Sequence, residues 1–91
     1  MNEQQFENVW DAIGDTPQEV LNLKLRSQIM DVLSGKISAE GWTQAEAAKR
    51  FGVTQPRVSD LTRGKISLFS LDALVNMLAA ANIETEVVMK G

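Results

Sequence analysis

The sequence contains no cysteine and no histidine. Without cysteine the chain can form neither a disulfide framework nor a thiolate metal site. Without histidine it lacks the commonest general base and the commonest metal ligand. Its carboxylates are scattered, and neither a nucleophile–base pair nor a set of metal ligands can be assembled from them. We therefore expect no enzyme activity, no metal and no cofactor.

Long apolar runs are also missing. No stretch of the sequence approaches the ~20 apolar residues that span a bilayer, and the acidic first ten residues do not resemble a secretory signal. We expect a cytoplasmic protein without membrane contact. The length of 91 residues suits one small domain, and 44% hydrophobic with 23% charged residues is ordinary for a globular chain.

The formal net charge of −3 conceals a segregation of charge along the chain. Residues 1–23 hold five acidic residues and no basic ones, and residues 66–91 hold three acidic and one basic. Residues 24–65 hold eight basic and four acidic residues, a net of +4. A basic middle between acidic ends predicts a polyanionic partner for the middle.

The N-terminal segment, residues 1–15, has the pattern of a short amphipathic helix ending at Gly14. Its apolar residues recur at i, i+3, i+4 and i+7, and are Phe6, Val9, Trp10 and Ile13. Beside them runs an acidic stripe at spacing four: Glu3, Glu7, Asp11 and Asp15. Two interpretations stay open. The apolar side chains dock on the protein's own core, or Phe6, Trp10, Ile13, Glu3, Glu7 and Asp11 bind a basic partner protein.

A second helix is predicted to begin at Thr16, which is followed by a proline and completes a capping box with Glu19. Its expected inner ridge has spacing four, with Val32 beside it, and consists of Leu21, Leu25, Ile29 and Leu33. We expect about four turns, weakened at Gly35, with the connection ending at Gly41.

Two short helices follow, separated by a turn. The first opens with a capping box at Thr43 and buries Ala47, Ala48 and Phe51; Gly52 then makes the turn. The second has Thr54 as its expected N-cap, and Pro56 lies in its first turn, where a missing N–H costs little. Val58 and Leu61 point inward, and Gly64 ends the helix. This spacing predicts a helix-turn-helix motif.

The last predicted helix begins at Ser70, carries Leu71, Leu74, Val75 and Leu78, and stops near Asn82. The β-branched residues from Ile83 to Met89 predict a strand. A lone strand is unstable, so it either pairs with its mate in a homodimer or with a partner's sheet, or folds back on its own helices unpaired.

The outer face of the helix after the turn carries the candidate base-reading residues. With Val58 and Leu61 inside, a helical wheel turns four residues outward, Pro56, Ser59, Asp60 and Arg63, and the candidate readers Gln55 and Arg57 flank them. Glutamine can pair with adenine and arginine with guanine in the major groove, and Ser59 suits either a base or a phosphate. Asp60 would repel phosphate, so it reads a cytosine or holds Arg57 or Arg63; an internal Arg57–Asp60 pair is the plainer alternative.

Other residues suit the phosphate backbone. They lie at helix N-termini or carry positive charge near the motif, and are Thr43, Gln44, Thr54, Arg63, Lys65, Lys49 and Arg50. For Thr43, helix capping alone is a sufficient explanation. An all-helical packing motif that does not bind DNA remains the alternative for the whole arrangement.

The segments "TQAEAA", "FGVTQPRVSDLTRGK" and "FSLDALVNML" resemble the Xre/Cro family of helix-turn-helix proteins over about residues 20–82. The flanking "NVWDAIGDTPQEVLNLKLRSQIM" and "NIETEVVMK" resemble HigA-like antitoxins, which are paired with RelE/HigB-like ribonuclease toxins. The resemblance implies phosphate binding by Gln44 and base reading by Gln55. The chain departs from lambdoid repressors at Pro56, where they often place a second polar reader, which shifts the expected readout toward Gln55, Arg57 and Ser59.

The expected fold is all-α and lambda-repressor-like, with five helices in total and a short C-terminal strand. One helix lies in the N-terminal segment over residues 1–15 and the others form the DNA-binding domain over residues 16–82, which a strand or tail over 83–91 follows. The resemblance implies a dimeric antitoxin that binds operator DNA, represses its own operon and binds a basic ribonuclease toxin. A stand-alone, phage-like Xre repressor without a toxin is the alternative.

Overall fold

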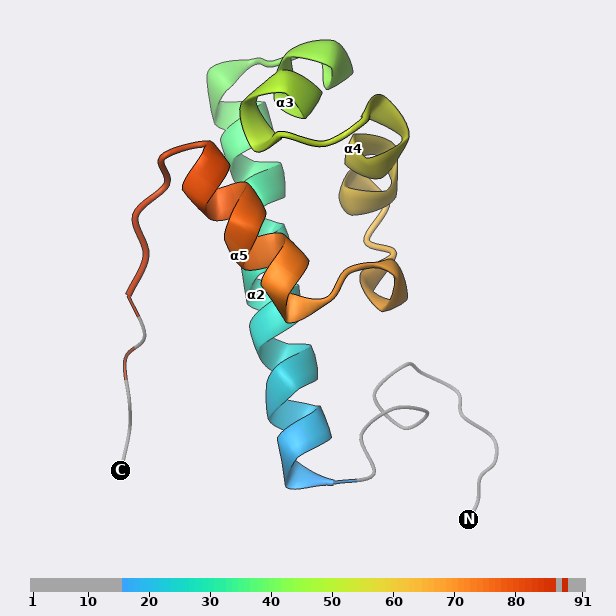
Figure 1. Ribbon diagram of the computed structural model, residues 1–91, viewed down its shortest axis with the longest axis vertical. Coiled ribbons are helices and arrows are strands. Elements are labelled where there is room, and N and C mark those ends of the chain that lie inside the picture. Colours follow the sequence, from blue (N-terminus) through green and yellow to red (C-terminus); the bar gives the residue numbers. More distant parts are fainter. Residues whose placement is uncertain (1–15, 87, 89–91) are drawn as a thin grey trace.

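The computed structural model describes residues 16–86 and residue 88. In that part of the chain the α-helices are α2 (Pro17–Glu40), α3 (Gln44–Phe51), α4 (Gln55–Thr62) and α5 (Leu71–Ala80), and a 3₁₀ turn, η1 (Ile66–Leu68), joins α4 to α5. Figure 1 shows α2 as the long axis of the molecule, with α3 near its C-terminal end and α5 packed along it. The predicted helix around Phe6–Ile13 lies outside the described residues.

Three of the predicted helix starts are confirmed by their capping hydrogen bonds. The side-chain oxygens of Thr16, Thr43 and Ser70 each accept a hydrogen bond of 3.1 Å from the backbone N–H three residues later. Each such bond satisfies an N–H that has no partner inside the helix. The sequence therefore predicts where α2, α3 and α5 begin.

The start of α4 differs in one detail. Thr54 occupies the N-cap position, but its side chain makes no capping hydrogen bond. An N-cap side chain accepts from the second or third helical residue. Here the second is Pro56, which has no N–H, and the N–H of the third, Arg57, donates to the carbonyl oxygen of Thr54 at 3.1 Å. Pro56 thus starts the helix, as predicted, and removes one of the donors that would have bonded a cap.

Helix α2 is longer than the sequence suggested. It runs for 24 residues, about 36 Å, and continues through Gly35 until Gly41 ends it in the left-handed conformation at φ 68°. Glycine weakens a helix by only about 1 kcal/mol. Core contacts from Leu33 and Ile37, on either side of Gly35, offset that cost.

The core lies between α2, α3, α4 and α5 and contains, among its buried members, Leu33, Ala47, Ala48, Phe51, Val58, Leu61, Phe69, Leu74, Met77 and Leu78. The predicted inner residues of the helix-turn-helix are among them except Val53 of the turn, which we also expect in the core and which is half-buried against it. The predicted ridge of α2 was right in part. Leu33 is buried and Ile29 packs against the core, but Leu25 is only half-buried and Leu21 and Val32 are exposed. Leu23 and Met30, which the prediction left out, are buried. In α5, Val75 is likewise exposed and Met77 buried.

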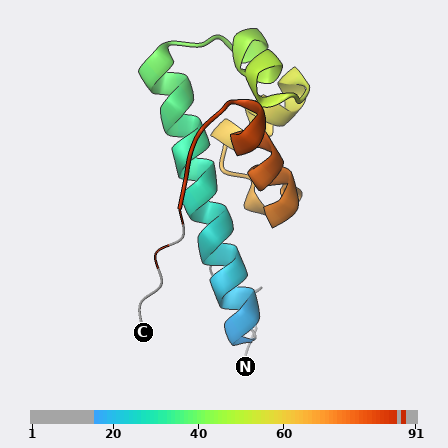
Figure 2. The same cartoon turned by 60° about the vertical axis from the view of Figure 1, so that its left-hand side comes forward.

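The predicted C-terminal strand is absent from the residues described, 83–86 and 88. After α5 the chain turns at Asn82, which is left-handed at φ 57°, and the N–H of Ile83 donates to the carbonyl oxygen of Leu78 at 2.9 Å. Figure 2 shows the segment that follows running along α2. A strand needs a neighbouring strand to satisfy its backbone, and the described part of this single chain offers none.

Candidate nucleic-acid interface

Helices α3 and α4 form the predicted helix-turn-helix. Gly52 makes the turn in the left-handed conformation at φ 72°, and its N–H donates to the carbonyl oxygen of Ala48. The N–H of Val53 donates to the same oxygen at 3.0 Å. Ala48 is buried where α3 meets its neighbours, so a small side chain is needed at this position. Short, local hydrogen bonds therefore fix the angle between the two helices.

Helix α4 has a buried side and an exposed side. Val58 and Leu61 are almost fully buried, and they anchor α4 in the core. Gln55 and Pro56 at its N-terminal end are exposed, as is Arg63 after its last turn, while Ser59 and Asp60 are half-buried. Gln55 makes no side-chain hydrogen bond to another described residue. The N-terminal end of α4 thus presents an amide that is free to bond another molecule.

Arg57 lies differently from its neighbours. Its Nη2 donates a hydrogen bond of 2.9 Å to the carbonyl oxygen of Leu68, and its guanidinium carbon lies 4.2 Å from the centre of the Phe69 ring. The guanidinium therefore stacks on the loop after α4, and neither of these contacts is the predicted internal pair with Asp60. Contact with a base would require this side chain to leave that position.

Asp60 forms its ion pair with Lys65 and not with Arg57 or Arg63, the two partners that the sequence predicted. Lys65 Nζ lies 3.9 Å from Asp60 Oδ1, and the N–H of Lys65 donates to the carbonyl oxygen of Asp60 at 3.1 Å. The lysine side chain is 47% exposed, so the ion pair adds little stability. It places a positive charge beside the C-terminal end of α4.

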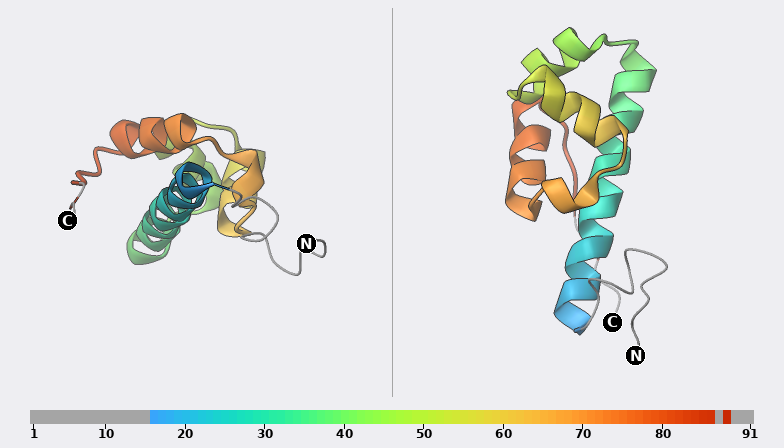
Figure 3. Two further views of the ribbon diagram at one scale, coloured as in Figure 1. Left: turned by 90° about the horizontal axis from the view of Figure 1, so that it is seen from below. Right: turned by 90° about the vertical axis from the view of Figure 1, so that its right-hand side faces the viewer.

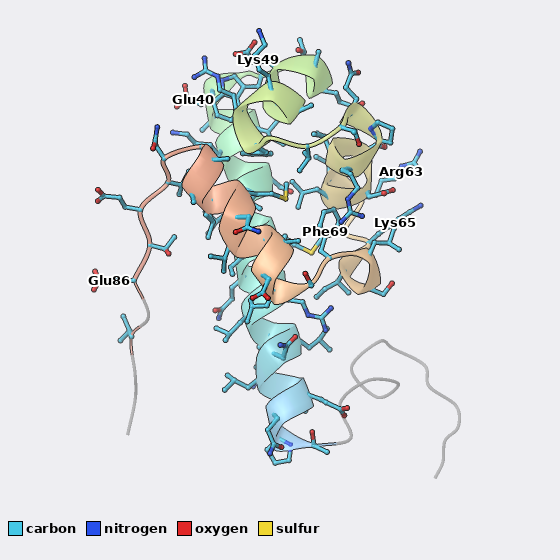
Figure 4. The ribbon with its side chains drawn as sticks, viewed as in Figure 1. Glu40, Lys49, Arg63, Lys65, Phe69 and Glu86 are labelled. Atoms are coloured by element: carbon cyan, nitrogen blue, oxygen red, sulfur yellow. The ribbon has the colours of Figure 1, made fainter. Side chains whose placement is uncertain are left out.

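The candidate phosphate-binding residues fall into two groups. Gln44 and Thr54 are exposed at the first turns of α3 and α4, where backbone N–H groups and the helix dipole favour an anion. Arg63, Lys65 and Lys49 are exposed cations, and Figure 4 shows Arg63 and Lys65 projecting from the same side of the molecule.

Arg50 is less free than these cations. Its Nε lies 2.8 Å from Glu46 Oε2, and its guanidinium lies over the Trp42 ring at 5.2 Å from the ring centre. It remains 54% exposed.

Arg26 of α2 is a structural residue that the sequence patterns did not single out. Its Nη1 donates to the carbonyl oxygens of Ile66 and Phe69 at 3.1 and 3.2 Å, and its Nε donates to Asn22 Oδ1 at 2.7 Å. No local pattern marks it, because its partners are 40 and 43 residues away and the sequence does not show that the face it shares with Leu23 and Met30 is the inner one.

Arg26 and Arg57 together hold the loop that follows α4. Between them they bond the carbonyl oxygens of Ile66, Leu68 and Phe69. The right-hand view of Figure 3 shows this loop passing from α4 through η1 to α5. Because Lys65 immediately precedes η1, the two arginines also fix the backbone that carries this candidate phosphate contact.

The described part of the chain gives no sign of other chemistry. Over residues 16–86 and 88, no group of acidic side chains is placed to hold a metal ion. None of the helices described there has the length and apolar character to cross a membrane.

A helix-turn-helix with an exposed polar face and adjacent cations defines the class of the protein. The family described as "Helix-turn-helix domain" matches residues 11–90. No curated protein matches the chain. A solved structure whose description assigns it to the XRE family of transcriptional regulators is similar, with 30% identity and a TM-score of 0.68; the match covers 77% of this chain and 79% of that one. The chain belongs to the helix-turn-helix domain family and is of the XRE type.

Proposed function

We propose that this XRE-type protein is a sequence-specific DNA-binding transcriptional regulator that reads operator DNA with the N-terminal end of α4. The observation that carries the proposal is the two-sided character of α4. Val58 and Leu61 fix its inner side in the core, while Gln55 is exposed and its side chain bonds no other described residue, at the end that enters a major groove in this motif. Arg57 and Ser59 are the further candidate readers.

The charge of the surrounding surface supports the same proposal. Arg63, Lys65 and Lys49 are exposed around the motif, and the first turn of α3 offers N–H groups to phosphates, whereas α4 offers only the N–H of Gln55 before Pro56. The chain as a whole is acidic, whereas residues 24–65, which include the helix-turn-helix, carry a net charge of +4. Phosphate contacts would position α4, and the base contacts would then supply sequence preference.

Mobility shifts with duplexes from the protein's own promoter region test DNA binding. Lys65→Ala is expected to weaken binding to the preferred and to a random duplex by the same factor. The slope of the logarithm of the binding constant against the logarithm of the salt concentration should fall by about 1, the contribution of one phosphate contact. Lys65→Arg keeps the charge and should keep most of the affinity. If the wild-type protein binds both duplexes equally weakly at low salt, the regulator proposal is wrong.

We further propose that the regulator is an antitoxin that represses its own operon, acts as a homodimer and binds a basic ribonuclease toxin of the RelE/HigB-like type. The resemblance to HigA-like antitoxins supports this role. The five acidic residues and absence of basic ones over residues 1–23 suit a basic protein and oppose DNA.

Removal of residues 1–14 tests the antitoxin role. The truncated protein is expected to lose affinity for a small basic toxin encoded by the neighbouring gene, because Phe6, Trp10 and Ile13 are removed together with all of the acidic stripe except Asp15. Its DNA binding should be unchanged, because α3 and α4 are intact. Isothermal titration with toxin and mobility shifts with DNA measure the two separately. Unchanged toxin affinity would remove the N-terminal segment from the interface, and no toxin binding by the full chain would favour a stand-alone repressor.

A further inference from the structure

Helix α2 has a second apolar face that the described part of the chain leaves uncovered. The inner face contains the buried Leu23, Met30 and Leu33. Nearly opposite this inner face lie six residues separated along the chain by alternating intervals of four and three positions: Leu21, Leu25, Gln28, Val32, Gly35 and Ala39. We call these six residues the outer stripe. They carry no charge, and five of the six are exposed, with Leu21 at 57% and Val32 at 44%. A spacing of four and three is the pattern of a helix that packs on another helix.

The outer stripe continues into a larger apolar surface. A groove of about 550 Å³ separates it from α5 and is lined by Ile29, Val75 and Ile83 among others, and a second groove of about 400 Å³ reaches Val32 and Val88. Of the five large hydrophobic side chains that are exposed in the described part, four lie on this surface: Leu21, Val32, Val75 and Val88. Such clustering marks a binding surface, because single exposed hydrophobic residues are normally scattered.

We propose that the outer stripe binds the outer stripe of a second copy of this chain, with the two α2 helices antiparallel about a two-fold axis at the level of Met30. In a two-fold interface, if residue i meets residue j then j meets i. Pairing about position 30 places Leu21 opposite Ala39 and Leu25 opposite Gly35, and Gln28 opposite Val32. Each leucine at one end of the stripe thus meets a small residue at the other end, so the surface complements itself.

Gly35 supplies an independent observation. It lies in the middle of α2 with ordinary helical geometry, where glycine is unfavourable. A Cβ atom placed on it would meet nothing within 4 Å, so no contact within the described chain requires a glycine there. The close approach of Leu25 from a second copy does require one. The glycine that the single chain leaves unexplained is therefore explained by the dimer.

The size of the surface agrees with a dimer of small chains. The outer stripe is about 27 Å long, and over a helix width of about 10 Å it offers roughly 270 Å². The α5 flank with Val75, and the segment with Ile83, enlarge this toward the roughly 500 Å² per copy that a specific dimer needs. None of the candidate DNA contacts Gln55, Arg63 and Lys65 is on this surface, so pairing leaves the reading face open.

The test measures the molar mass of the full chain without DNA, by sedimentation equilibrium from 1 to 500 µM. The wild-type protein is expected to be a dimer, and Val32→Glu to raise the dissociation constant at least 100-fold. Gly35→Leu is the sharper variant. It improves helix propensity, and its Cβ meets no described atom within 4 Å, so its thermal midpoint at monomeric concentrations should be equal or higher, while dimerisation is lost. Leu68→Glu, at an exposed hydrophobic residue outside the surface, should stay dimeric.

The chain has no cysteine, so single cysteines test the pairing directly. A mixture of Leu25→Cys and Gly35→Cys proteins should form a disulfide-linked dimer on oxidation, and neither protein alone should do so efficiently.

A monomeric wild-type protein at 500 µM, or a dimer that Gly35→Leu leaves intact, overturns the proposal. So does a monomer that dimerises only when residues 1–15 are removed, because the chain's own N-terminal segment would then occupy the surface. This pairing is the interface of the homodimer in the proposed function and rests on that part of it: a monomer overturns both the homodimer and the pairing, whereas a dimer that Gly35→Leu leaves intact overturns the pairing alone. Since no DNA is present, neither outcome bears on DNA binding.

Discussion

Replacement of Phe69 by alanine is expected to lower the free energy of unfolding by about 3–5 kcal/mol. The ring is 1% exposed and belongs to the core between α2, α4 and α5. Its removal leaves a cavity and also takes away the surface on which the guanidinium of Arg57 lies at 4.2 Å. Because a small domain is stable by only about 5–15 kcal/mol, a large part of the variant protein should be unfolded near physiological temperature. Urea denaturation followed by circular dichroism measures the change.

Phe69→Leu is the matched control, because leucine keeps most of the volume and loses the aromatic face. It should cost about 1–1.5 kcal/mol. A double-mutant cycle with Arg57→Ala isolates the stacking of the guanidinium on the ring, for which we expect a coupling of about 0.5–1 kcal/mol. A loss below 1 kcal/mol for Phe69→Ala would show that the ring does not hold the loop after α4 against the core.

The features that the sequence predicted correctly are those set by residues close together in the chain. A Thr or Ser side chain caps the N–H three residues later, as at Thr16, Thr43 and Ser70. Gly52 makes the turn because glycine adopts the left-handed conformation at no steric cost. The exposed position of Gln55 and the burial of Val58 follow from one helical wheel. The helix-turn-helix is built from such short-range rules, so its position and its two faces could be predicted from the sequence alone.

The features that the sequence predicted wrongly depend on contacts between distant residues. Helix α2 carries apolar residues on two nearly opposite faces, and hydrophobic periodicity cannot tell which of them faces the core. Leu21 and Leu25 form the more regular series, yet Leu23 and Met30 are buried. The tail has the composition of a strand but no neighbouring strand among the described residues. The bonds from Arg26 and Arg57 to the loop span 11 to 43 residues, which no local pattern reveals.

Gln55→Ala is expected to weaken binding to the preferred operator by about 1–3 kcal/mol, relax the preference at one base pair and leave binding to random DNA nearly unchanged. Gln55 is exposed at the first turn of α4 and its side chain bonds no other described residue, so the free energy of unfolding should change by less than about 0.5 kcal/mol. Gln55→Glu is the matched control of similar shape, and it should bind worse than alanine because its charge repels the nearby phosphates. Equal losses on operator and random duplexes would assign Gln55 to the backbone.

Arg57→Ala should behave differently, because the guanidinium already has partners in the free protein. Loss of its hydrogen bond to the Leu68 carbonyl oxygen and of its stacking on Phe69 should cost about 1–2 kcal/mol of folding stability. For Arg57 to bond a guanine, the free energy gained from that contact must exceed the free energy lost with its hydrogen bond to Leu68 and its stacking on Phe69. If it does, Arg57→Ala weakens binding to the operator duplex more than binding to a random duplex, when both are measured at temperatures where the variant is fully folded. If the two losses are equal, Arg57 contacts phosphate; if both are absent, its role is to hold Lys65 and the loop, and base reading falls to Gln55 and Ser59.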